Sequence, residues 1–337
     1  MIEDSTVGIE ELAPTVSVIV VSFNTRDLLR ECLTALYKEL TGILSEVLVI
    51  DNASRDNSAV MVAAEFPQAR LFTSDVNLGF GPANNVALNE ARGSYIVLLN
   101  SDAFFGEGAL RIAIARMEKH PKAGLGGAML VGRDGEWQPS ARMFPSILND
   151  LLMFTGLSAK YPKSRFFGRG DRTWDDPQRE AQVDWVPGAF SIIRREVLQR
   201  VGFFDPRFFL YYEEVDLCLR IHQAGYELWY WPQIRVVHIG GESSRTHGEI
   251  EMSSSGSQLV LWRMRSALLY FRKHHGWQAW LLQWMERSLY LLSGLRNRFS
   301  SDSRRVARRR EMLRLNQTMQ HAWHETDGGR VSPPAPW

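Results

Sequence analysis

Two polar segments of the chain carry residue types suited to metal binding and proton transfer. The first is Asn100-Ser101-Asp102, which directly follows the apolar run 95–99. A carboxylate at the end of a buried strand, with an amide two residues earlier, is suited to bind a divalent cation and the diphosphate that the cation neutralises. The same residue types are common in ordinary turns. The motif alone leaves a metal site and a turn both open.

The second segment places Glu213, Glu214 and Asp216 beside Tyr211 and Tyr212. A solvated helix face is the ordinary interpretation of such a charge cluster. The aromatic neighbours favour partial burial, which raises the pKa of a carboxyl group towards that of a useful general base. One ionised carboxylate could then remove a proton from a substrate hydroxyl while another holds a hydroxyl or a backbone N–H.

His238 ends a β-branched run, 233–238. A lone histidine after a strand is more often a structural hydrogen-bonding residue than a ligand. If this strand end lies beside Asp102, however, the imidazole and the carboxylate could share one divalent ion. Such a pair would leave coordination positions open for phosphate oxygens.

Strand and helix signals alternate along the first hundred residues. The pattern predicts strands at 16–21, 46–51, 69–73 and 95–99, and helices at 27–40, 58–66 and up to about residue 91. This alternation predicts βαβ units and a mostly parallel sheet flanked by helices. Right-handed crossovers would bring the strand ends at 22–24, Asp51 and Asp102 to one edge, where open α/β sheets bind ligands.

The middle of the chain changes character. A helix is predicted at about 108–120, and residues 132–184 are rich in Arg, Pro, Trp and Phe with weak periodicity. A long irregular segment with many aromatic residues favours a cleft wall or a lid. Further helices are predicted at 194–201 and from Glu213 to a stop at Gly225, with the acidic residues in the first turn.

Composition narrows the functional classes. The chain has 337 residues, of which 45% are hydrophobic, and a net charge of +1, so it carries no overall signature of nucleic-acid binding. Its two cysteines, Cys32 and Cys218, fit a reducing compartment. The acidic N-terminus does not resemble a signal peptide, and no uninterrupted apolar run is long enough for a clear membrane span. A cytoplasmic location is therefore predicted.

The C-terminal third is predicted to be helical and is rich in Trp and Arg. A basic helix that carries Trp suits the interface of an anionic membrane, whereas a helical hairpin packed on the catalytic domain explains the same pattern. The sequence-based division is an N-terminal extension at 1–14, an α/β domain at 15–250, a helical extension at 251–326 and a disordered tail at 327–337. The α/β domain divides into a nucleotide-binding half, 15–130, and an acceptor half, 131–250.

Between about residues 16 and 244 the chain resembles the family 2 glycosyltransferases of the GT-A fold, and it is most similar to bacterial rhamnosyltransferase-like enzymes of cell-surface polysaccharide synthesis. The resemblance rests on ordered motifs: Val-Val-Ser-Phe-Asn-Thr (20–25), Val-Ile-Asp-Asn-Ala-Ser (49–54), Asn-Leu-Gly-Phe-Gly-Pro-Ala-Asn-Asn (77–85), Leu-Leu-Asn-Ser-Asp (98–102), Trp-Val-Pro-Gly-Ala-Phe (185–190), Tyr-Tyr-Glu-Glu-Val-Asp-Leu-Cys-Leu-Arg (211–220) and His-Ile-Gly-Gly (238–241).

The resemblance implies an α/β GT-A fold with a Rossmann-like sheet, and inverting transfer from a nucleoside-diphosphate sugar. It also implies roles for individual residues. Donor binding is implied for Ser22, Asn24, Asp51, Asn77, Gly79, Asn84, Asn100, Ser101, Trp185 and Gly188. Metal binding is implied for Asp102 and His238, and the catalytic group contains Glu214, Glu213 and Asp216. Glu214 falls where the family places an Asp as the base, and Asn100 stands in the first position of the family's Asp-x-Asp motif, where Asp is common.

The implied partners are a dTDP- or UDP-sugar, with dTDP-rhamnose as the leading donor, and a saccharide or polyprenyl-diphosphate-linked acceptor. The implied cofactor is Mg²⁺ or Mn²⁺. An anionic membrane surface is a further expected partner, at the inner face of the plasma membrane. Two other functions share parts of the pattern. They are a metal-dependent nucleotidyltransferase and a non-catalytic sugar-nucleotide or polysaccharide scaffold at a membrane.

Overall fold

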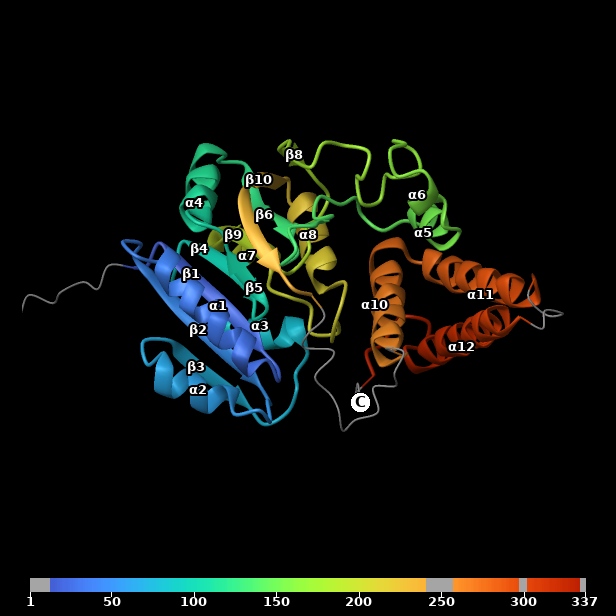
Figure 1. Ribbon diagram of the computed structural model, residues 1–337, viewed down its shortest axis with the longest axis horizontal. Helices are drawn as coiled ribbons and strands as arrows, with labels where there is room; N and C mark the ends of the chain where they lie inside the picture. The colour runs from blue at the N-terminus through green and yellow to red at the C-terminus, as the bar shows by residue number, and fades with distance from the viewer. Residues whose placement is uncertain (1–12, 241–256, 297–301, 334–337) are drawn as a thin grey trace, which may run out of the picture.

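A ten-stranded sheet forms the centre of the molecule (Figure 1). The computed structural model describes residues 13–240, 257–296 and 302–333. One half of the sheet is parallel, in the order β3-β2-β1-β4. Its strands are β1 (Val16–Ser22), β2 (Ser45–Asn52), β3 (Arg70–Ser74) and β4 (Tyr95–Asn100). The βαβ prediction for this half is confirmed.

The other half of the sheet is mixed. β9 (Phe190–Arg194) lies antiparallel between β4 and β6 (Ala123–Val131), and β10 (Glu227–His238) runs parallel to β6. β5 (Ala103–Phe105) is antiparallel to β10 at the edge. The sheet as a whole is therefore mixed rather than mostly parallel, because the chain returns from a long excursion before it enters β9. The short strands β7 (Trp137–Gln138) and β8 (Ala181–Gln182) pair with β6 and β10.

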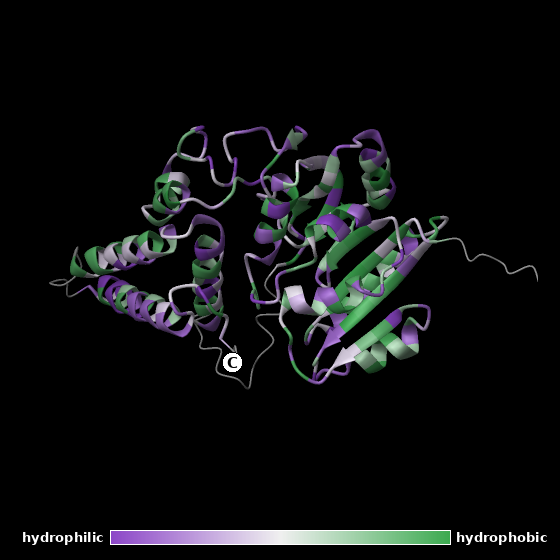
Figure 2. Cartoon of the chain, turned by 180° about the vertical axis from the view of Figure 1, so that it is seen from behind, coloured by the Kyte–Doolittle hydropathy of each residue, from purple (hydrophilic) through white to green (hydrophobic). Residues whose placement is uncertain are grey.

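Helices cover both faces of the sheet. One face carries α1 (Arg26–Glu39), α2 (Ser58–Glu65) and α4 (Ala109–Lys119), and the other carries α3 (Phe80–Leu88), α7 (Arg195–Val201) and α8 (Glu213–Gln223). Alternate side chains of a strand enter different cores: Val18 and Val20 pack on one face and Ile19 on the other. This two-sided burial explains why the strands are continuous apolar runs. Figure 2 shows apolar strands between helices with hydrophilic outer turns.

The excursion between β6 and β9 contains two short helices, α5 (Ile147–Phe154) and α6 (Leu157–Lys160), which lie above the C-terminal helices in Figure 1. The Phe154 ring packs edge-on against Tyr290, with ring centroids 6.2 Å apart. The aromatic segment therefore connects the sheet to the C-terminal helices.

The C-terminal extension consists of α10 (Ser257–His275), α11 (Gln278–Arg296) and α12 (Ser303–Glu325). These helices share a core with Phe208, Val215 and Leu219, which lie in and before α8. Among the described helices, none combines the length and apolarity needed to cross a membrane. The extension is thus packed on the catalytic half, as the predicted hairpin alternative requires.

The prediction of a disordered tail is wrong for residues 327–333. The Gly328 carbonyl accepts a hydrogen bond of 2.8 Å from Arg272 Nε, and Gly329 N–H donates to Thr326 Oγ1 at 3.0 Å. Gly329 lies so close to α10 that a Cβ there would be 2.2 Å from the Leu268 carbonyl oxygen. Residues 334–337 lie outside the described ranges. So do most of the predicted N-terminal extension, the boundary near residue 250 and the end of the His-Ile-Gly-Gly motif.

Candidate active site

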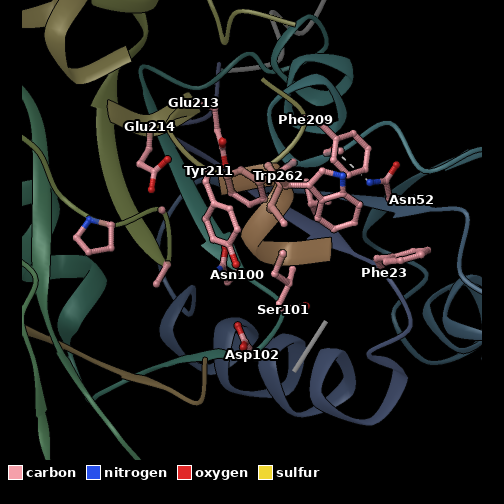
Figure 3. A pocket seen from close by; sticks show the side chains of 18 of the residues that line it. Phe23, Asn52, Asn100, Ser101, Asp102, Phe209, Tyr211, Glu213, Glu214 and Trp262 are labelled. Carbon is pink, nitrogen blue, oxygen red and sulfur yellow. Dashed lines mark hydrogen bonds between the residues drawn. The ribbon is translucent and has the colours of Figure 1, made fainter. Parts of the chain in front are cut away.

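A pocket of about 320 Å³ opens at the carboxyl ends of β1, β2 and β4 (Figure 3). Because these strands are parallel neighbours, their ends coincide: Ser22 is in register with Asp51, and Val21 with Asn100. The predicted convergence of strand ends is confirmed. The predicted residues that line the pocket are Asn77, Gly79, Asn100, Ser101, Asp102, Gly188, Glu213, Glu214 and His238.

Asp102 and His238 lie together at one end of this pocket. The antiparallel pairing of β5 with β10 brings His238 Nε2 within 3.6 Å of Asp102 Oδ1, and Gly240 N–H donates to Asp102 Oδ2 at 3.1 Å. Burial lowers the pKa of His238, although the charge of Asp102 acts in the opposite direction. A neutral imidazole beside a carboxylate is a suitable pair of ligands for Mg²⁺ or Mn²⁺, and better suited to Mn²⁺.

Gln138 fixes the orientation of the His238 ring. Its Nε2 donates to the His238 backbone carbonyl at 2.9 Å, and its Oε1 lies 3.0 Å from His238 Nδ1. Because a carbonyl can only accept, the amide orientation is set, and Nδ1 must carry the proton. The lone pair of Nε2 then faces Asp102 and the pocket. No pattern in the sequence indicates this role of Gln138.

The residues present fit a metal bound jointly with a diphosphate. Asn100 Oδ1 is buried and has no hydrogen-bond partner among the described residues. No group of three or more His, Cys, Asp or Glu side chains suited to a metal occurs in the described part of the chain. Asp102 and His238 would therefore need phosphate oxygens to complete the coordination sphere.

Ser22 and Asn24 lie behind the pocket rather than in its wall. The hydroxyl of Ser22 is 3.1 Å from that of Thr25, which is 2.9 Å from that of Ser101, so a chain of hydroxyl groups leads to the pocket floor. Asn24 accepts a hydrogen bond of 2.7 Å from Arg55 N–H and thereby joins two loops. Ser22 and Asn24 thus make supporting contacts in this structure, and their contacts with the donor stay predictions.

Asp51 is also outside the pocket wall, but one of its carboxylate oxygens is free to accept a further hydrogen bond. Its Oδ2 accepts from Ser54 N–H at 3.2 Å, whereas Oδ1 is buried without a partner among the described residues. An N–H group of a nucleotide base could satisfy that oxygen after a small opening of the loop.

Asn52 organises the loop at 77–79. Its Nδ2 donates to Asn77 Oδ1 at 2.9 Å and to the Gly79 carbonyl at 3.2 Å. Its Oδ1 accepts from Leu78 N–H at 2.8 Å. Its position directly after Asp51, at the end of β2, is the only sequence signal for this role.

Gly79 allows two loops to approach closely. Its φ is +87°, and a Cβ there would lie 2.3 Å from the carbonyl oxygen of Phe209. The Phe80 N–H donates to that same oxygen at 2.8 Å. Asn84, by contrast, is buried and donates to the Phe80 carbonyl at 2.9 Å inside α3, so the structure does not bring its side chain into the pocket.

Glu213 and Glu214 enter the pocket from the first turn of α8 (Figure 3). The two preceding residues, Tyr211 and Tyr212, have φ values of +69° and +67°, an uncommon conformation for bulky residues that sites of function often retain. The Oε2 atoms of both glutamates are buried without a hydrogen-bond partner among the described residues. Both acids are thus available to a bound substrate.

The two carboxyl groups differ in their surroundings. Burial, reinforced by the adjacent Glu214 charge, raises the pKa of Glu213 well above its ordinary value. Burial also raises the pKa of Glu214, but backbone hydrogen bonds and the charge of Arg142 oppose this effect. These surroundings favour ionisation of Glu214 before Glu213.

The predicted catalytic role of Asp216 is corrected by its position. The side chain is fully buried and contacts Arg220 Nε at 2.9 Å, Lys273 Nζ at 2.6 Å and His274 Nε2 at 2.7 Å. Burial alone would raise the pKa of Asp216, but these partners outweigh it and lower the pKa below the ordinary value. Asp216 joins α8 to α10.

Trp185 likewise lies outside the pocket wall. Its Nε1 donates to the Met143 carbonyl at 2.8 Å, and the Arg142 guanidinium lies 5.0 Å from the centre of its ring. These contacts fasten Trp185 to the aromatic segment, and its contact with the donor stays a prediction. Gly188 of the same motif does line the pocket.

Aromatic side chains that the sequence did not assign to the site form much of its wall. The rings of Phe209 and Trp262 have centroids 4.9 Å apart, and Phe23, Phe80 and Tyr211 also line the pocket. Trp262 comes from α10, so the C-terminal extension contributes directly to the site (Figure 3). No local pattern links it to strand ends more than 150 residues away, and only the tertiary fold reveals it.

Comparisons of the chain with known proteins agree with this geometry. A family model described as glycosyl transferase family 2 matches residues 17–202. An N-acetylglucosaminyl-diphospho-decaprenol L-rhamnosyltransferase of Mycobacterium tuberculosis is 30% identical over 79% of this chain and 87% of its own. Rhamnosyltransferase WbbL of Escherichia coli is 28% identical over 58% of this chain and 70% of its own.

A solved structure supports the fold. Mannosyltransferase PcManGT from Pyrobaculum calidifontis, in complex with GDP-Man and Mn²⁺, superimposes with a TM-score of 0.56 and 16% identity over 93% of this chain and 88% of that chain. The predicted GT-A fold is thereby confirmed. The matched family model and the relatives together show that the chain belongs to glycosyl transferase family 2.

Proposed function

We propose that this protein transfers a sugar, with inversion, from a nucleoside-diphosphate sugar to a saccharide on a lipid carrier in bacterial surface polysaccharide synthesis. The observation that carries the proposal is the arrangement of one pocket. Figure 3 shows Glu213 and Glu214 on one side of the pocket and Asp102 on the other, and His238 lies 3.6 Å from Asp102. A base and a diphosphate-binding pair facing one cavity are what a direct displacement requires.

In the proposed reaction Glu214 removes the proton from an acceptor hydroxyl. The acceptor oxygen forms a bond to the anomeric carbon as the bond from that carbon to the diphosphate breaks on the opposite side, and the nucleoside diphosphate leaves with the electron pair. Protonated Glu213 donates a hydrogen bond that orients the acceptor or the donor sugar. General-base assistance of this kind contributes about 10²–10⁴-fold in rate.

Asp102 and His238 would hold Mg²⁺ or Mn²⁺ together with the donor diphosphate. The bound ion would neutralise the charge that develops on the leaving diphosphate. The chain's own contribution is to keep the His238 ring in its ligating orientation through Gln138 and to keep Asp102 fixed through Gly240 N–H.

The leading donor is dTDP-L-rhamnose, and the leading acceptor is a sugar linked to a polyprenyl diphosphate. The names of the Mycobacterium tuberculosis and Escherichia coli relatives support transfer of rhamnose, and the name of the Mycobacterium tuberculosis relative supports the lipid-linked acceptor. The unpartnered Asp51 oxygen suits the imide N–H of thymine or uracil, which favours dTDP- or UDP-sugars. The proposed place of reaction is the cytoplasmic face of the plasma membrane.

A donor and acceptor screen tests this function. The purified protein is incubated with dTDP-rhamnose, UDP-sugars or GDP-mannose, with Mn²⁺ or Mg²⁺, and a short polyprenyl-diphosphate-linked N-acetylglucosamine. We expect transfer from one dTDP- or UDP-sugar, and NMR of the product is expected to show an inverted anomeric centre. Retained anomeric configuration, or release of pyrophosphate instead of sugar transfer, contradicts the proposal.

A further inference from the structure

The exposed face of α11 is apolar along the described length of the helix. Its exposed side chains are Trp277, directly before the helix, and Trp280, Trp284, Leu291, Leu292 and Leu295, which are 40–66% exposed. At about 100° per residue these six positions fall within an arc of about 120°, and they extend along about 27 Å of helix. We call this set the α11 stripe.

A stripe of three exposed tryptophans on one helix is unusual for a surface in contact with water alone. The buried face of α11 is already occupied, because Leu282, Met285 and Tyr290 belong to the core shared with α10 and α12. The α11 stripe is therefore a second apolar face of the same helix, separate from the core face and largely exposed in the described part of the chain.

The charges next to the α11 stripe are mainly positive, and Asp302 at the N-cap of α12 is the one exposed acid before Glu311 among the described residues of that helix. α12 begins with a run in which Arg304, Arg305, Arg308 and Arg310 are exposed, and the first acid of that helix is Glu311. A Cβ added at Gly294 of α11 would lie 4.0 Å from Met312 Cβ, so the end of the stripe lies near the part of α12 that directly follows its basic turns. The one acid of α11, Glu286, is 1% exposed and faces the core.

We propose that the α11 stripe and the basic turn of α12 (residues 304–310) form a docking face for an anionic membrane surface. Tryptophan and leucine side chains enter the boundary between headgroups and acyl chains, while arginines attract anionic headgroups. The helices lie on the bilayer rather than cross it, in keeping with the opposite face of α11, which is packed in the core of the extension. This deepens the proposed function, because it supplies the surface that carries a polyprenyl-linked acceptor.

The position of α10 links the docking face to the site. Trp262 of α10 lines the pocket, and the same helix ends at His275, directly before Gly276 and the start of the α11 stripe. The residues from Trp262 to His275 span about 20 Å. A docked α11 would thus hold the pocket at a fixed distance from the bilayer surface, within reach of a sugar linked to a polyprenyl diphosphate.

Vesicle flotation of the full-length protein tests the proposal without any sugar transfer. The vesicles contain phosphatidylcholine alone, or with about one third phosphatidylglycerol. We expect flotation with the anionic vesicles at low salt, and much less with neutral vesicles or at high salt. The Trp280→Gln/Trp284→Gln variant and the Arg304→Gln/Arg305→Gln/Arg308→Gln variant are each expected to bind more than about tenfold more weakly.

Matched controls use exposed residues elsewhere. Val60→Gln replaces an apolar side chain that is 67% exposed on α2, and Lys119→Gln/Lys122→Gln removes two exposed charges from the α4 side of the molecule. Both controls should float like the wild type, and unchanged thermal melting of all variants shows that the fold is intact.

Flotation that is absent, or equal in the variants and the wild type, overturns the proposal. A concentration-dependent dimer that Trp280→Gln/Trp284→Gln abolishes, without vesicle binding, assigns the stripe to a second copy instead and also overturns it. Vesicle binding is measured without donor or acceptor. A failure of membrane docking can therefore be distinguished from a failure of the proposed sugar transfer.

Discussion

At the scale of single residues, Glu213 and Glu214 have the same chemistry but different surroundings. Burial raises the pKa of both groups, and Arg142 opposes this effect at Glu214. We expect the transfer rate to fall at acid pH through an apparent pKa above the ordinary glutamate value of about 4.3, because the base must be ionised. A kcat/KM profile against pH measures this limb. A limb at or below the ordinary value would show that Glu214 is not desolvated in the working enzyme.

The role of Gln138 can be tested separately from the ligands it supports. Gln138→Ala removes the group that fixes His238, and loss of such an outer contact typically weakens metal affinity about 10–100-fold. We therefore expect a higher Mn²⁺ concentration for half-maximal activity and a smaller thermal shift with Mn²⁺ and nucleoside diphosphate. Gln182→Ala, at an exposed position of β8, is the control and should leave both values unchanged. Equal behaviour of the two variants would remove Gln138 from the site.

At the scale of elements, the contact between the start of α3 and the loop before α8 depends on a glycine. In Gly79→Ala the new Cβ would lie 2.3 Å from the Phe209 carbonyl oxygen, so the loop that presents Glu213 and Glu214 must shift. A displacement of about 1 Å at a reacting group can cost about 10²-fold in rate. Gly156→Ala is a matched control, because Gly156 has φ +73° but open space around its Cβ position. Both variants carry the backbone strain, and only Gly79→Ala should lose transfer in a steady-state assay.

Asp216 determines how α8 is held against α10, and its ionisation gives a pH-dependent test. Because its folded pKa is lowered, it stabilises the fold above its unfolded pKa of about 3.9, and the stabilisation is lost as the pH falls through the folded pKa. Asp216→Asn should cost about 3–5 kcal/mol at neutral pH, since it leaves buried cations unpaired. Urea unfolding at several pH values should show this difference shrinking below about pH 4. The surface variant Asp27→Asn should show little change at any pH, and a pH-independent cost for Asp216→Asn would contradict the assignment.

At the scale of the whole molecule, the sequence predicts those elements and site residues that depend on local residue patterns. The strands β1, β2 and β4 and the convergence of their ends follow from apolar runs and βαβ connections, and Asp102, Glu213, Glu214 and His238 were found because they end or begin such elements. The antiparallel insertion of β9 was not predictable, because it depends on where a long irregular excursion returns. Asn52 and Trp262 were missed, since their roles come from tertiary contacts. Asp216 was misassigned, although Arg220 four residues later was a signal for a helix ion pair.

The central claim is that Glu214 is the base of a sugar transfer whose donor is held mainly by the opposite side of the pocket. The most direct measurement compares the wild type with Glu214→Gln, in turnover with the identified donor and acceptor and in donor affinity by calorimetry. We predict that turnover falls by about 10²–10⁴-fold while the donor Kd changes by less than about threefold. Turnover that is retained, or donor binding that is lost in parallel with turnover, would contradict the account.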